Sequence, residues 1–126
     1  MALTKGRIYG IRYRASNLIG WSSWSATSYI QAAKAPQAPP ALVTTGTTSN
    51  SITLQINPTL EDNGAVVSNY KIYMDGGDLT TPITTLIHTG MGPTYIVTNS
   101  NHGVVSGKKY RFVSTAINTH GESLPS

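Results

Sequence analysis

Short stretches of alternating polar and apolar residues, separated by turn signals, run through most of the chain. Residues 51–56 alternate, with Ile52, Leu54 and Ile56 at the apolar positions, as expected of half-buried strands. Residues 67–74 alternate again and place Tyr70 and Ile72 on one face. Further short strands are expected at 83–87 and 94–98, with turns at 61–64 and 75–78. No helical period is sustained, so the pattern predicts an all-β fold, an antiparallel β-sandwich with these apolar residues in its core.

Two copies of one local pattern lie far apart in the chain. Residues 6–25 and 107–126 align without a gap at an offset of 101 (107 minus 6). The identical positions are, in the first copy, Gly6, Tyr9, Ala15, Asn17, Gly20, Ser22 and Ser25. Each copy begins with alternating apolar side chains that we expect in a core: Tyr9, Ile11 and Tyr13 in the first, Tyr110 and Phe112 in the second. The offset is about the length of one sandwich domain, which indicates a tandem array.

The two copies carry a resemblance to a known family. Tyr9-x-Ile11-x-Tyr13-x-Ala15-x-Asn17-x-x-Gly20 and its second copy resemble the sixth strand, F, of fibronectin type III domains. Residues 104–110 are similar to the turn of that family in which a tyrosine hydroxyl caps a bend. Residues 39–43, 51–57 and 67–74 resemble its strands A, B and C. The family usually has a core tryptophan near the end of strand B, where this chain has Ile56. The resemblance implies a fibronectin type III (immunoglobulin-like) antiparallel β-sandwich.

The resemblance also implies a division of the chain. Residues 1–35 would hold the C-terminal strands, F and G, of a partial unit, and residues 36–126 would hold strands A to F of the next, with its G strand missing. A Pro-rich linker, 35–40, joins the two. Two explanations stay open: the sequence is a window from a longer array, or neighbouring chains share strands and polymerise head to tail. In the second case the donated strand would include Ala26, Ser28, Tyr29, Ile30 and Gln31.

Trp21-Ser22-Ser23-Trp24-Ser25 matches the WSxWS pattern that follows strand F in class I cytokine receptors. In those receptors arginines of strand F stack between the tryptophans, so the resemblance implies a structural cation–π ladder of Arg12, Arg14, Trp21 and Trp24. The second copy has no tryptophan at these positions, which argues against a receptor ectodomain, the third hypothesis. Trp21-x-x-Trp24 also looks like a signal for C-linked mannose, and the Thr/Ser-rich stretch 44–51 is a candidate for O-linked glycan. The C-linked mannose would require passage through a secretory pathway.

Composition narrows the function classes. Charged residues make up only 11% of the 126 residues, and the net charge of +4 comes without any dense basic stripe, which argues against nucleic-acid binding. The chain has no cysteine, and hence no disulfide. No stretch approaches the ~20 apolar residues of a membrane span, so we expect no membrane insertion. No apolar segment follows Met1 as in a signal peptide.

The polar residues do not assemble into a catalytic pattern. His88, His102 and His120 are scattered, and none has a partner at a metal-ligand spacing. The acidic pairs at 61–62 and at Asp75 and Asp78 lie in turns with too few oxygens for calcium. We therefore expect no enzyme, no cofactor and no metal site. The sequence predicts a structural or interaction module of an extracellular or cell-surface protein, with neighbouring repeats or identical chains as its protein partners.

Overall fold

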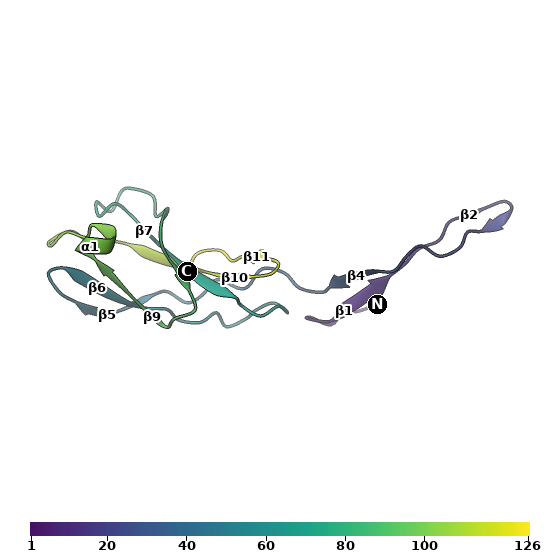
Figure 1. Ribbon diagram of the computed structural model, residues 1–126, viewed down its shortest axis with the longest axis horizontal. Helices are drawn as coiled ribbons and strands as arrows, with labels where there is room; N and C mark the ends of the chain where they lie inside the picture. Colours follow the sequence, from purple (N-terminus) through teal and green to yellow (C-terminus); the bar gives the residue numbers. More distant parts are fainter.

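The computed structural model describes residues 1–126 and consists of a β-sandwich with a hairpin arm projecting from one end (Figure 1). One sheet of the sandwich has the strand order β5 (Val43–Thr47), β6 (Ser51–Gln55), β9 (Thr94–Thr98). The other has the order β11 (Gly121–Glu122), β10 (Phe112–Asn118), β7 (Asn69–Met74), β8 (Thr85–Gly90). Neighbouring strands pair antiparallel throughout. The all-β antiparallel prediction is confirmed.

The arm consists of two short ladders in one long hairpin. At its base, β1 (Ile8–Ile11) pairs with β4 (Ser28–Gln31), and at its tip β2 (Ser16–Asn17) pairs with β3 (Gly20–Trp21). The register places Tyr9 opposite Ile30, with both on the same face. Of the residues named as a possible donated strand, Ser28 to Gln31 therefore pair within their own chain, with Tyr29 and Ile30 mostly exposed, whereas Ala26 lies outside the ladder. Whether they also pair with a neighbour stays a prediction.

The one helix, α1 (Asn99–His102), was not expected from the sequence. Thr98 caps it by accepting a hydrogen bond from the Asn101 N–H, and the Asn101 side chain accepts one from the Thr98 N–H in return. This reciprocal arrangement stabilises a single turn where the hydrophobic pattern carries no helical signal. The chain has no helix of the length and apolar character that crossing a bilayer requires.

The core lies between the two sheets, because alternate side chains of each strand point inward. Its buried members are Leu54, Ile56, Tyr70, Ile72, Met74, Ile87, Val97, Val104 and Ala116. Ile52, Tyr110 and Phe112 are half-buried against this cluster. Ile56 thus fills the position where the resemblance would place a tryptophan, and it is 4% exposed.

The arm departs from the core prediction. Tyr9 is half-buried, whereas Ile11 is 53% and Tyr13 76% exposed. Assigning Ile11 and Tyr13 to a core is wrong for this chain, because no second sheet covers the arm. Their counterparts at the same offset, Phe112 and Ser114, face the sheet formed by β5, β6 and β9 and are half-buried and buried.

A short strand, β11, pairs with the edge of β10 at the position where the sequence predicted that a final strand is missing. β11 pairs with β10, and the Ser126 N–H then donates to the Ser114 carbonyl at 2.8 Å. Residues 121–126 therefore already follow the edge of β10 where a final strand belongs.

Candidate functional site

The two sequence copies make the same hydrogen bonds. The Tyr9 hydroxyl accepts from the Thr4 N–H at 2.6 Å, and the Tyr110 hydroxyl accepts from the Val105 N–H at 2.9 Å. Both tyrosines thus cap a bend five residues upstream, where the backbone N–H would otherwise lack a partner. The glycine that follows each bend has a positive φ, 80° and 85°, which glycine adopts without a steric penalty.

The serines of the return strands are also equivalent. Ser22 Oγ accepts from the Ala15 N–H at 3.0 Å, and Ser123 Oγ accepts from the Ala116 N–H at 2.9 Å. The next conserved serine of each copy repeats this bond one step further along the hairpin. The serines of the Trp-Ser-Ser-Trp-Ser segment therefore complete the backbone pairing, which leaves the tryptophans as the feature that distinguishes the first copy.

The arginines and tryptophans of the arm form a stack on its outer face. The Arg14 guanidinium lies 4.4 Å from the centre of the Trp21 ring and 4.7 Å from that of Trp24, and Arg12 lies 4.4 Å from Trp24. Each such contact is worth ~0.5–1 kcal/mol at an exposed site. The rings remain 63% and 47% exposed. The stack covers the face opposite Ile11 and Tyr13, because successive side chains of an extended segment alternate.

The same positions of the second copy carry a polar cluster. Glu122, at the position of Trp21, accepts hydrogen bonds from Lys71 Nζ at 2.7 Å, Tyr73 Oη at 2.8 Å and Thr115 Oγ1 at 2.6 Å. Burial raises the pKa of the Glu122 carboxyl, but these three bonds outweigh it and hold the pKa below its usual value. The two copies therefore share their backbone hydrogen bonds but differ in the side chains of the outer face.

A hydrogen-bonded junction joins the arm to the sandwich, and Asn118 lies at its centre. Asn118 Nδ2 approaches three backbone carbonyls, those of Lys34 at 2.8 Å, Asp62 at 3.1 Å and Ala65 at 3.2 Å. Its Oδ1 accepts from the His120 N–H at 2.8 Å. One buried amide thus connects the end of the arm at Lys34, the turn after β6 and the turn after β10, a role that no local sequence signal indicates.

The turn after β6 forms the rest of the junction. Asn63 Nδ2 donates to the Ala35 carbonyl at 2.7 Å, and the Lys34 N–H donates to the Asn63 carbonyl at 3.3 Å. Gln31 Nε2 donates to the Gly64 carbonyl at 3.0 Å. A β-carbon on Gly64 would lie 2.6 Å from the Gly6 nitrogen, so only glycine permits this approach of the two backbones.

One ion pair lies at the edge of this junction. Lys5 Nζ is 2.6 Å from Glu61 Oε2, and the hydrogen bond from Lys5 lowers the pKa of the Glu61 carboxyl. Both side chains are well exposed, so the pair adds little to stability by itself. It connects the basic arm to the acidic turn of the sandwich.

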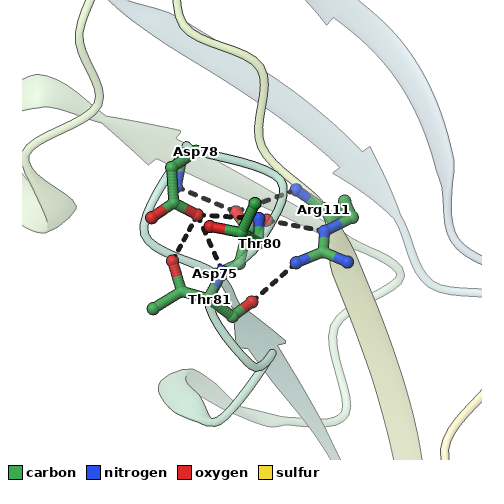
Figure 2. A network of polar contacts seen from close by, with 6 residues as sticks. Asp75, Asp78, Thr80, Thr81 and Arg111 are labelled. Atoms are coloured by element: carbon green, nitrogen blue, oxygen red, sulfur yellow. Dashed lines mark hydrogen bonds and ion pairs between the residues drawn. The ribbon is translucent and has the colours of Figure 1, made fainter.

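A second polar network lies at the far side of the sandwich, in the loop between β7 and β8 (Figure 2). Asp75, 1% exposed, accepts from Arg111 Nε at 2.7 Å, from the Arg111 N–H at 3.1 Å and from the Gly77 N–H at 3.0 Å. Burial raises the pKa of the Asp75 carboxyl, but the bonds from Arg111 and Gly77 more than offset this, so the pKa lies below its usual value. Arg111 Nη2 also donates to the Thr81 carbonyl at 2.6 Å.

Asp78 organises the same loop from its other end. Its Oδ1 accepts from the Thr81 hydroxyl, from the Thr81 N–H at 2.8 Å and from the Thr80 N–H at 2.9 Å, and these bonds lower its pKa (Figure 2). Each of the two carboxylates is thus used in fixing the loop. The sequence identified both as turn residues but did not predict Arg111 as the partner of Asp75.

The histidines do not converge on one site. His88 stacks on Tyr95 with ring centres 4.2 Å apart, and the Tyr95 hydroxyl lies 2.7 Å from His102 Nε2. His120 Nε2 lies 3.1 Å from Gln31 Oε1 in the junction. No group of three or more histidine, cysteine or carboxylate side chains is arranged to hold a metal ion.

No protein-family model matches the sequence, and no curated protein sequence matches it. Solved structures do match. Domains A168–A170 of titin share 21% identity over 90% of this chain and 36% of theirs, with a TM-score of 0.66. The fourth fibronectin type III domain of a human protein shares 18% over 89% and 87%, with a TM-score of 0.66. Domains d3–d4 of the rat CD45 extracellular region share 17% over 100% and 64%, with a TM-score of 0.64.

These likenesses establish the fold: the chain is a fibronectin type III-like β-sandwich, as its sequence indicated. It spans about a third of the titin structure and just under two thirds of the CD45 structure. At these identities the likeness is one of fold, and function has to be argued from the chain itself.

Proposed function

We propose that the chain is a non-catalytic structural and interaction module from a tandem array of fibronectin type III units. The hydrogen bonds that recur at an offset of 101 residues carry this proposal. Tyr9 and Tyr110 cap equivalent bends, and Ser22 and Ser123 complete equivalent hairpins. Two copies of one frame, one domain length apart in one chain, are what a tandem arrangement produces.

The junction supports a spacer role for the module. Asn118, Asn63 and Gln31 bind backbone carbonyls of the linker and of its two neighbouring turns. Interfaces between domains of one chain are mobile by default, and these directed bonds restrict that motion. Consecutive units would then keep a fixed relative orientation.

Nuclear magnetic relaxation of backbone amides tests the spacer role. We expect the arm and the sandwich of the native chain to tumble as one body. Asn63→Asp removes one of the three side-chain amide donors of the junction and should increase the independent motion of arm and sandwich. Asn50→Asp, the same change at an exposed position whose side chain makes no hydrogen bond, should not. Independent tumbling of arm and sandwich in the native chain would contradict the spacer role.

The proposed setting is extracellular or at the cell surface. The exposed Trp21-x-x-Trp24 segment resembles a C-mannosylation signal, and one similar structure is the extracellular region of rat CD45. Mass spectrometry of the chain secreted from a eukaryotic host should show a hexose on tryptophan. Secretion without any such addition would remove this support.

A second candidate is a filament subunit that shares strands with identical chains. The observation in its favour is the uncovered apolar face of the arm, where Ile11, Tyr13 and Ile30 are exposed. Sedimentation velocity over a range of concentrations separates the two candidates. A single monomeric species supports the array module, and a concentration-dependent series of oligomers supports the filament.

A further inference from the structure

The charge of this chain is divided unevenly between its two parts. Residues 1–35 contain Lys5, Arg7, Arg12, Arg14 and Lys34 and no acidic residue, which gives +5. Residues 36–126 contain the other four basic and all five acidic residues, which gives −1 and accounts for the total of +4. The positive potential is therefore concentrated on the arm.

Arg12 and Arg14 are held by the tryptophans, and their charges have no partner within the chain. Lys5 is already paired with Glu61. Arg12 and Arg14 contact no carboxylate in the chain, and no hydrogen bond in the chain uses their guanidinium groups. Contact with the Trp21 and Trp24 rings, at 4.4 to 4.7 Å from the ring centres, restricts where the two guanidiniums can lie. A guanidinium has five N–H donors, and because none of those on Arg12 and Arg14 is used within the chain, they remain available to a ligand.

The arm presents this pair on one face of an extended segment. Arg12 and Arg14 are two residues apart on an extended segment, hence about 7 Å apart along it. Gly10 leaves room on the same face for the Tyr29 ring, whose Cε1 would lie 3.2 Å from a β-carbon at that position. The opposite face carries Ile11 and Tyr13, so this surface stays exposed whether or not another sheet covers the apolar side.

We propose that Arg12 and Arg14 bind an acidic polysaccharide, through its sulfate or carboxylate groups, on the outer face of the arm. Guanidinium forks match both groups in bidentate geometry. A single-stranded nucleic acid would bind by stacking its bases on aromatic faces. The Trp21 and Trp24 rings are already engaged by guanidiniums, Trp24 by two and Trp21 by one, which leaves Tyr29 as the aromatic ring on this face without a cation contact. The corresponding positions of the second copy, Val113 and Thr115, carry no charge, so the site belongs to the arm alone.

The test uses the full chain and its own fluorescence. Trp21 and Trp24 are the only tryptophans, so a change in tryptophan emission on adding heparin or hyaluronate reports on this face directly. We expect saturable binding of heparin, hyaluronate or both, weakened by salt because counterions are released. Heparin carries sulfate and carboxylate groups and hyaluronate carries carboxylates only. Binding of heparin alone would therefore assign the site to sulfate, and binding of both would show that carboxylates suffice. Failure of both to bind would overturn the proposal.

Paired variants locate the site. The double variant Arg12→Gln and Arg14→Gln should lower the affinity about tenfold and reduce the salt dependence. The matched control, Lys108→Gln and Lys109→Gln, makes the same change of charge on exposed residues of the sandwich and should leave the affinity unchanged. Equal losses in both double variants would mean a diffuse charge effect and would overturn the proposal.

A variant that conserves charge and a comparison with DNA test the role of the guanidinium and the class of partner. Arg12→Lys with Arg14→Lys keeps both charges without the planar fork, and we expect its affinity to lie between those of the native chain and the glutamine variant even if the stack loosens. An affinity no better than that of the glutamine variant would contradict this. Single-stranded DNA should bind more weakly than the polysaccharides at equal salt, and tighter binding of DNA would overturn the proposal in favour of a nucleic-acid partner.

Discussion

Asn118→Asp is the sharpest perturbation of the junction, because it changes one amide nitrogen into a carboxylate oxygen and leaves the shape of the side chain unchanged. The Asn118 amide nitrogen faces three backbone carbonyls at 2.8 to 3.2 Å. An amide has two N–H donors, so at least two hydrogen bonds are lost. The new carboxylate would also face carbonyl oxygens, which repel it.

The magnitude follows from the number of groups left without partners. Each buried polar group that loses its only partner costs about 1–3 kcal/mol. Two such groups together predict a loss of about 3 kcal/mol, or about 10–20 °C in melting temperature for a sandwich of this size. Thermal unfolding followed by circular dichroism measures this directly. Hydrogen exchange should also become faster at the backbone amides of Lys34, at the end of the arm, and of Gln37, in the linker, which both donate to the turn after β6.

The chain contains its own control at the equivalent position of the arm. Asn17 Oδ1 accepts from the N–H groups of Ile19 and Gly20, and its amide nitrogen makes no hydrogen bond. Asn17→Asp keeps that acceptor and adds the same charge, so its effect should stay within ~0.5 kcal/mol. Equal melting temperatures for Asn17→Asp and Asn118→Asp would refute the assignment of Asn118 as the centre of the junction.

Three further outcomes are expected. The lowered pKa of Asp75 means that its charged form stabilises the fold above about pH 4 and that this contribution is lost as the pH falls through the lowered value. Asp75→Asn should therefore have a lower free energy of unfolding in urea at neutral pH, and that free energy should fall less in acid than it does for the native chain. Parallel pH profiles for the two proteins would contradict this. Gly77→Ala places a β-carbon 2.5 Å from the Tyr110 ring at a φ of 76° and should destabilise the sandwich more than Gly107→Ala, which has φ 85° but open space around it; equal thermal shifts would show that the ring moves freely. Gly64→Ala, with its β-carbon against the backbone of the arm, should speed exchange at the linker amides more than Gly107→Ala does.

The sequence predicted the parts of the structure that depend on local pattern. Alternation located β6, β7 and β9 to within two residues, and placed Leu54 and Ile72 in the core. The offset of 101 residues predicted two equivalent tyrosine-capped bends because each bend is made within five residues of its own tyrosine. The stacking of Arg14 between Trp21 and Trp24 was implied by the family resemblance of a single short segment.

The junction depends on contacts that no local pattern encodes. Asn118 meets the Lys34 carbonyl from 84 residues away, and Asn63 meets Ala35 from 28 residues away. An asparagine at the end of a strand predicts a turn, and a turn does follow Asn118. The sequence does not predict which carbonyls the amide nitrogen of Asn118 reaches. The exposure of Ile11 and Tyr13 escaped prediction for a related reason: alternation indicates which face is apolar and does not say whether another sheet covers it.

The directed bonds between linker and turns have a mechanical consequence. Residues 34 and 35 are attached through their carbonyls to Asn118 and Asn63. Bending the chain at residues 34 and 35 would therefore require the same hydrogen bonds to break as opening this end of the sandwich. A string of such units would resist thermal bending and lengthen in fixed increments with every unit added.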